Sequence, residues 1–180
     1  EPGGGLHQPG RAGVDGSARL DPRPADHLEE LTAGLQGRVT RAEEHFAAGR
    51  YDEAEIEYKN VLQLEAVNPA ALGRLGTIFF EQSRILVARP FLQKASELSP
   101  TDLELKIKLG YIDLALRDFA GARAKAIAVL DKDPAHPLAP LLLAEAAPTV
   151  KDMDEARQRL RALPTAAGAP VQVALGSMDL

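Results

Sequence analysis

The side chains of this chain that could do chemistry are four histidines and several pairs of carboxylates, and their spacing suits neither metal binding nor acid–base catalysis. The histidines are scattered and lack the i, i+4 spacing that places two zinc ligands on one helix face; they are His7, His27, His45 and His136. Most carboxylate pairs lie at expected helix starts and turns. Helix N-termini favour anionic side chains and capping oxygens, which accounts for Asp52, Asp102 and Asp152. We therefore predict no enzyme, no metal and no cofactor.

Composition narrows the classes of partner. The 180 residues are 45% hydrophobic, which is enough for one helical domain. The 21 basic and 26 acidic residues give a net charge of -5 with no long run of either sign, so nucleic acid is not an expected ligand. No apolar run is long enough to span a membrane. Cysteine is absent, which excludes disulfides and leaves the compartment open between cytoplasm, periplasm and secretion.

A period of 34 residues organises the chain from Tyr51 onward. That interval is typical of a helix–turn–helix solenoid, in which stacking buries the faces that a single helix pair leaves exposed. The series of alanines is expected where the two helices of a pair cross closely, because only a small side chain fits there. Four series keep the interval: Ala54, Ala88, Ala122 and Ala156; Tyr51, Ile85, Phe119 and Met153; Tyr58, Leu92, Ala126 and Leu160; Val61, Ala95, Val129 and Leu163.

Turn residues divide the chain into helix pairs. Residues 1–25 are rich in Gly and Pro and predict a flexible arm, with helix beginning near Asp26 as an N-cap. Gly49 is expected to end the first helix of the first pair with a positive φ. Pro148 is expected to shorten the first helix of the fourth pair. The predicted pairs are 38–48 with 52–64, 70–82 with 86–98, 102–116 with 119–131, and 138–147 with 152–162.

The residues of the pairs resemble the tetratricopeptide repeat family. The second pair shows the pattern best, with Leu72, Leu75-Gly76, Phe79, Ala88, Leu92 and Pro100. The third keeps Leu109-Gly110, Ala122 and Pro134 but has Asp113 in the aromatic position, and the fourth keeps Leu143-Ala144, Ala156 and Leu160. The first turn, Gly49 to Ala54, is also typical of the family. The resemblance implies an all-α, right-handed α-solenoid of antiparallel helix pairs that binds proteins.

We expect residues 26–164 to hold four such repeats, at about 35–68, 69–102, 103–136 and 137–168. Residues 169–180 look like the start of a fifth repeat, because Leu175 to Leu180 repeats the pattern of Leu109 to Leu114. This favours a fragment of a longer array, with apolar residues at an open C-terminal end that pack on another molecule or on the array itself. The run Glu55 to Leu64 faintly resembles bacterial exosortase-associated members of the family.

The first helix of each pair is expected to line the concave side of the solenoid, which makes its surface the candidate binding site. Residues at i and i+3 recur one repeat later and form a strip. We predict a groove for a peptide or protein segment, with Arg74 and Lys108 as neighbouring cations, against two alternatives: an ordinary solvated helix face, and a structural module that assembles through its repeat ends. The strip consists of Thr40 with Glu43, Arg74 with Thr77, Lys108 with Tyr111, and Leu142 with Glu145.

The family's clamp for the C-terminal carboxylate of chaperones gives a more specific comparison. The resemblance places its lysine, asparagine and basic positions at Val39, Glu43, Arg74, Glu104 and Lys108. Only Lys108 keeps the expected residue type, so the resemblance does not predict a chaperone-tail clamp here.

Overall fold

The structure is a computed structural model that describes residues 24–179, and this part of the chain folds into nine α-helices. Most of the predicted arm of residues 1–25, with His7, lies outside the described residues. The chain divides into two compact units, residues 1–34 and 35–180. The helices are α1 (Pro24–Ala47), α2 (Tyr51–Leu64), α3 (Pro69–Glu81), α4 (Ile85–Leu98), α5 (Leu103–Ala115), α6 (Phe119–Leu130), α7 (Ala139–Glu145), α8 (Val150–Arg161) and α9 (Ala169–Ser177).

The predicted helix pairs match these bounds closely from α2 onward. The exception is α1, which starts at Pro24 and continues through Gly34 and Gly37, so Asp26 lies inside the helix and is not its N-cap. The predicted break at Pro148 is confirmed, because α7 ends at Glu145 and α8 begins at Val150.

Short polar side chains start several of these helices. Asn68, Asp102 and Asp118 each accept a hydrogen bond from the backbone N–H three residues later, and Thr149 does the same for α8. Such caps satisfy donors that the helix cannot satisfy itself. The three acidic residues predicted at helix starts lie there: Asp102 caps α5, and Asp52 and Asp152 lie in the first turns of α2 and α8.

The helix pairs are closed by a tight turn at the end of the first helix. Gly49 has a φ of 71°, as predicted, and the N–H of Arg50 donates to the carbonyl of His45 at 2.9 Å while Gly49 N–H donates to Phe46 at 3.0 Å. This pair of bonds is the Schellman arrangement, which ends a helix in a left-handed residue. The chain therefore reverses within three residues and α2 packs back.

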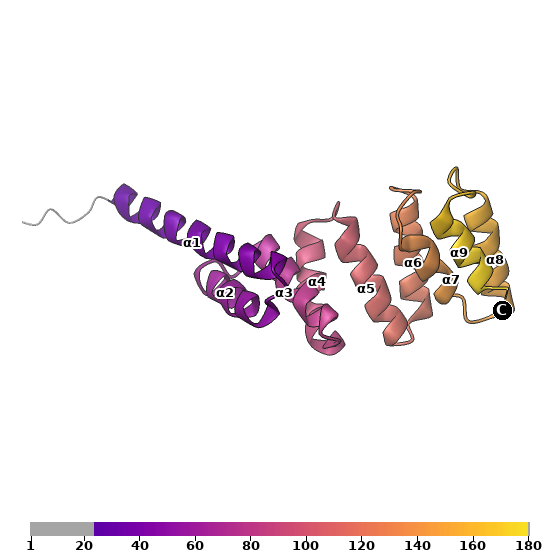
Figure 1. Ribbon diagram of the computed structural model, residues 1–180, viewed down its shortest axis with the longest axis horizontal. Helices are drawn as coiled ribbons and strands as arrows, with labels where there is room; N and C mark the ends of the chain where they lie inside the picture. Colours follow the sequence, from indigo (N-terminus) through magenta and orange to yellow (C-terminus); the bar gives the residue numbers. More distant parts are fainter. Residues whose placement is uncertain (1–23, 180) are drawn as a thin grey trace, which may run out of the picture. The chain divides into compact units, whose positions relative to one another are not determined.

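Each helix from α2 onward packs on the next one along the chain, and α3, α5, α7 and α9 also contact one another in succession (Figure 1). The first helices of the pairs therefore form a continuous layer. The alanine series lies where the helices cross: Ala54, Ala88 and Ala122 are fully buried and Ala156 is 2% exposed. Their predicted burial is confirmed.

The core consists of two clusters of buried side chains that meet at α5. Leu105, Leu109 and Ile112 face the cluster formed with the helices before α5, and Ile107 belongs to the cluster formed with the helices after it. A helix that is apolar on two faces is buried on two faces. This double burial makes α5 the element through which the two halves of residues 35–180 pack together.

Asp113, which stands in the family's aromatic position, is buried in this core. Its carboxylate forms an ion pair and hydrogen bond with Lys125 of α6, and its other oxygen lies 3.6 Å from Arg89 of α4. An ionised carboxylate is stable in such a place only when it is paired. The polar substitution is therefore compensated by cations on the helices that pack against α5.

Pro90 does not break α4, although it is the sixth residue of the helix and lies beyond the first turn, where a missing N–H costs nothing. Pro90 lies on the exposed side of α4, where water can reach the carbonyl that loses its partner.

The C-terminal helix α9 packs on α7 and α8. Most of the apolar surface that we expected at an open end is covered in this way: Val171, Met178 and Leu160 are buried, and Leu163 and Leu175 are partly buried. Val173 remains 61% exposed. None of the described helices is both long enough and apolar enough to cross a membrane.

Candidate functional site

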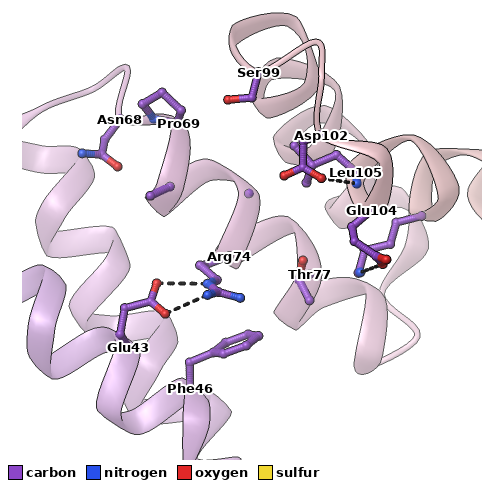
Figure 2. A pocket seen from close by; sticks show the side chains of 13 residues that line it. Glu43, Phe46, Asn68, Pro69, Arg74, Thr77, Ser99, Asp102, Glu104 and Leu105 are labelled. Carbon is purple, nitrogen blue, oxygen red and sulfur yellow. Dashed lines mark hydrogen bonds and ion pairs between the residues drawn. The ribbon is translucent and has the colours of Figure 1, made fainter. Parts of the chain in front are cut away.

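A pocket of about 760 Å³ lies between the first helices of successive pairs, α1, α3 and α5. Its size falls in the range of small-ligand and peptide sites, roughly 300–1,000 Å³. Four residues of the predicted strip line it together: Glu43, Arg74, Thr77 and Lys108. Figure 2 shows Glu43, Phe46 and Arg74 on one side of the pocket and Asp102, Glu104 and Leu105 on the other.

Arg74 is held in place from two directions. Its Nε and Nη2 donate to the two oxygens of Glu43 at 3.0 and 2.9 Å, and its guanidinium carbon lies 4.5 Å from the centroid of the Phe46 ring (Figure 2). Bidentate pairing and stacking fix the plane of a guanidinium. The Arg74 side chain nevertheless remains 42% exposed, so its remaining N–H groups can reach a ligand.

Tyr58 of α2 also holds the carboxylate of the Glu43–Arg74 ion pair. Its hydroxyl donates to Glu43 Oε1 at 2.7 Å. Burial and the hydrogen bond to Glu43 raise the pKa of Tyr58, so the hydroxyl keeps its proton and remains a donor. Burial lowers the pKa of Arg74, but the bonds and charge of Glu43 outweigh that effect and the net shift is upward. The charged form of Arg74 is thus secured by its neighbours.

The α5 side of the pocket carries Lys108 and two carboxylates. Lys108 Nζ lies 3.6 Å from Glu104 Oε2, one turn earlier on the same helix. Asp102 caps α5, accepting from the N–H of Leu105 at 3.2 Å (Figure 2). Across the whole pocket, three carboxylates (Glu43, Asp102 and Glu104) face two cations (Arg74 and Lys108), a formal balance of -1. The pocket therefore offers both donors and acceptors and has no net positive field.

The rest of the predicted strip lies outside this pocket. Leu142 is fully buried in the core, so its placement on the groove surface was wrong. Thr40 is exposed and its hydroxyl donates to the carbonyl of Gln36. Tyr111 and Glu145 do not line the pocket. Burial, and then the charge of Glu145, raise the pKa of Tyr111, whereas burial alone raises the pKa of Glu145.

Several pocket residues were missed by the sequence analysis. Phe46 follows Glu43 by three residues on α1, a spacing that places both on one helix face and was the available signal. Asp102 was read only as a cap and Glu104 only as a departure from the chaperone clamp. No group of three or more His, Cys, Asp or Glu side chains is arranged for a metal ion within residues 24–179.

This chain is similar in fold to two solved structures and similar in sequence to two curated proteins. Two solved structures share the helical-solenoid fold: the first tetratricopeptide domain of Spaghetti (RPAP3), bound to the HSP90 peptide SRMEEVD (TM-score 0.52, 20% identity, 71% of this chain and 94% of that one), and MamA MSR-1 C2 (TM-score 0.62, 17% identity, 81% and 87%). The BBSome complex member BBS4 of Bos taurus and that of Mus musculus are each 26% identical over 110 residues, 61% of this chain.

The chain spans about a fifth of the length of these BBS4 relatives, since the match covers 21% of each. A family model gives the broader match. The tetratricopeptide repeat model fits residues 39–102 and 107–170, which together make up more than half of the sequence. The chain belongs to the tetratricopeptide repeat family.

Proposed function

We propose that this chain is a protein-interaction scaffold that binds an extended peptide segment of a partner in the pocket between α1, α3 and α5. The observation that carries the proposal is the immobilised guanidinium of Arg74, which Glu43 and Phe46 hold at the pocket surface. A guanidinium has five N–H groups. Two of those on Arg74 donate to Glu43. The others can bind carbonyl or carboxylate oxygens, and little further side-chain entropy is lost because the guanidinium is already held in place.

The mixed lining favours peptide backbone over a purely anionic ligand. Lys108 and Thr77 add donors, while Asp102 and Glu104 add acceptors on the opposite side. An extended backbone presents alternating N–H and carbonyl groups that match such a lining. An acidic segment would have to compete with Glu43 for Arg74 and with Glu104 for Lys108. The solved Spaghetti complex, in which a peptide occupies a domain of the same fold, supports a peptide as the class of ligand.

The experiment is a selection of random peptides on the immobilised protein, followed by affinity measurements with the peptides obtained. The double variant Arg74→Gln/Lys108→Gln should weaken their binding about tenfold or more, because a hydrogen bond to a charged group contributes about 1.5–3 kcal/mol. The loss should be larger at low salt.

The matched control is Lys94→Gln/Lys151→Gln, which makes the same charge change on the exposed helices α4 and α8 and should alter affinity less than about twofold. Equal effects of the two double variants would contradict the proposed site.

The alternative function is a structural module that self-associates through its C-terminal end. Exposed Val173 on α9 and Val150 on α8 are the apolar side chains that favour it. The surface available is smaller than the sequence suggested, because Val171 and Met178 are buried against the preceding helices. Sedimentation over a wide concentration range separates the two functions, since a peptide-binding monomer keeps one sedimentation coefficient.

A further inference from the structure

The carboxylate of Glu43 is held from two sides at the edge of the proposed peptide site. The guanidinium of Arg74 donates to both of its oxygens, at 3.0 and 2.9 Å (Figure 2). The hydroxyl of Tyr58, on α2, donates to Oε1 at 2.7 Å. The position of Glu43 beside Arg74 is therefore fixed by a residue of another helix as well as by the ion pair itself.

Tyr58 is the part of this arrangement that a ligand cannot reach. It is fully buried and does not line the pocket, whereas the side chains of Glu43 and Arg74 are 37% and 42% exposed. A hydrogen bond to a charged acceptor is stronger than one between neutral groups. A ligand that pulled Glu43 away from Arg74 would also have to break this bond, and would leave a buried hydroxyl without its acceptor.

The fixed carboxylate determines which oxygens can bind to Arg74. With Glu43 in place, the ion pair carries no net charge. A neutral carbonyl oxygen can accept a hydrogen bond from the remaining N–H groups of the guanidinium. A carboxylate in the same place meets the negative charge of Glu43 at close range, and such a repulsive contact is a means of rejecting a ligand.

We infer that Tyr58 is a positioning residue that makes the peptide site select uncharged segments over acidic ones, because it holds Glu43 against Arg74. The inference rests on the proposed function, since it concerns the ligand of the same pocket. It adds the class of peptide, which is one that presents backbone or amide carbonyls to Arg74 and not a carboxylate. The charge of Glu43 rejects the acidic ligand, and the hydroxyl of Tyr58 keeps that ligand from displacing Glu43.

The probe is a random dodecapeptide library, selected in parallel on the wild type and on the variants. Peptides enriched on the wild type are then made in matched pairs that differ only by Gln or Glu at the enriched position. The Gln peptide should bind the wild type about tenfold more tightly. This ratio should fall to about twofold in Tyr58→Phe, where Glu43 can move aside, and should reverse in Glu43→Gln, where the repelling charge is gone.

The ratio of the two affinities separates selection from stability, because a general loosening of the fold weakens the binding of both peptides alike. Tyr51→Phe is the matched control. It removes a hydroxyl from the same helix, keeps the contact of the ring with Phe46, and should leave the ratio unchanged. A ratio in Tyr58→Phe equal to that of the wild type would overturn the inference.

A measurement without peptide distinguishes failure of this inference from failure of the proposed function. The Nε–H of Arg74 should exchange with water about fivefold faster in Tyr58→Phe, as measured by NMR, because its acceptor Glu43 is held less firmly. Equal exchange rates would contradict the positioning role of Tyr58. If the rates differ but the library yields no enriched peptide, the proposed function is overturned and the anchoring of Glu43 by Tyr58 is supported.

Discussion

Ser83 and Arg117 adopt the same left-handed backbone conformation, with φ of 58° and 63°, at equivalent positions 34 residues apart. Both repeat the turn made by Gly49: the N–H of Arg84 donates to Phe79 at 2.8 Å, and that of Asp118 donates to Asp113 at 2.8 Å. A side chain in this region clashes with its own carbonyl, at about 1–2 kcal/mol, whereas glycine does not. The first turn is therefore relaxed and the next two are strained.

Replacing Ser83 by glycine should stabilise the protein. Relief of the strain exceeds the extra chain entropy of glycine in the unfolded state, so we expect a gain of about 0.5–1 kcal/mol in chemical denaturation. Gly49→Ala is the reciprocal control and should cost a similar amount. Arg117→Gly should gain less, because Arg117 also lies over the Phe119 ring at 5.9 Å. A loss of stability in Ser83→Gly would show that the turn is not strained.

The glycines of the Leu-Gly motif should respond differently to alanine. A Cβ on Gly76 would lie 2.6 Å from Leu92 Cγ and 2.9 Å from the Leu92 backbone nitrogen, so the α3–α4 crossing itself must open. A Cβ on Gly110 would meet Leu142 Cδ2 at 2.5 Å, the far end of a side chain that can rotate. We expect Gly76→Ala to cost about 2–3 kcal/mol and Gly110→Ala about 1 kcal/mol.

Thermal and urea unfolding of the two alanine variants, made separately, check this order. Gly34→Ala in α1 is the control, since nothing lies within 4 Å of its Cβ position. It should be neutral or slightly stabilising because alanine favours helix. Equal losses at Gly76 and Gly110 would contradict the difference between backbone and side-chain contacts.

The helices and the buried alanines could be predicted from the sequence, because every repeat must bury the same positions and this requirement produces the 34-residue period. The sequence predicted the pocket chemistry only in part. We compared positions 34 residues apart, which pairs Glu43 with Thr77, but Glu43 binds Arg74, 31 residues on and one turn earlier along α3. Side-chain length and helix tilt decide such contacts, and neither is encoded in a repeat period. Leu142 was misplaced as well, since it is fully buried and its side chain packs beside Gly110 of α5.

The two cations beside Asp113 should contribute unequally to the stability of the fold. Lys125 forms a hydrogen-bonded pair with the buried carboxylate, whereas Arg89 stays at 3.6 Å and does not donate to it. Lys125→Met should therefore destabilise the fold by roughly 1–3 kcal/mol, and Arg89→Met by less than about 1 kcal/mol. Urea denaturation measures both.

The double variant Asp113→Leu/Lys125→Met tests whether the loss comes from an unpaired carboxylate. It removes both charges from the α5–α6 contact and should recover most of the stability lost in Lys125→Met, because apolar replacements of a buried pair are often neutral. A double variant no more stable than the single one would show that packing of the lysine stem, and not the charge of Asp113, accounts for the loss.

Asp152 should give the stability a measurable dependence on pH. The hydrogen bond from Thr149 lowers the pKa of Asp152, and the charge of Arg123, whose Nη1 lies 2.7 Å from Asp152 Oδ1, lowers it further. Since the folded state holds this carboxylate ionised more strongly than the unfolded state does, its contribution is complete above the ordinary Asp value of 3.8. The contribution is lost as the pH falls through the lower folded-state value.

Asp152→Asn should therefore melt at a lower temperature than the wild type at neutral pH, and this gap in melting temperature should close under acidic conditions. Thr149→Val should show the same narrowing with a smaller gap, because Arg123 still pairs with Asp152 in that variant. Melting curves between about pH 2 and pH 7 measure the gap directly, and a gap that stays constant over this range would mean that Asp152 acts through its size or helix propensity and not through its charge.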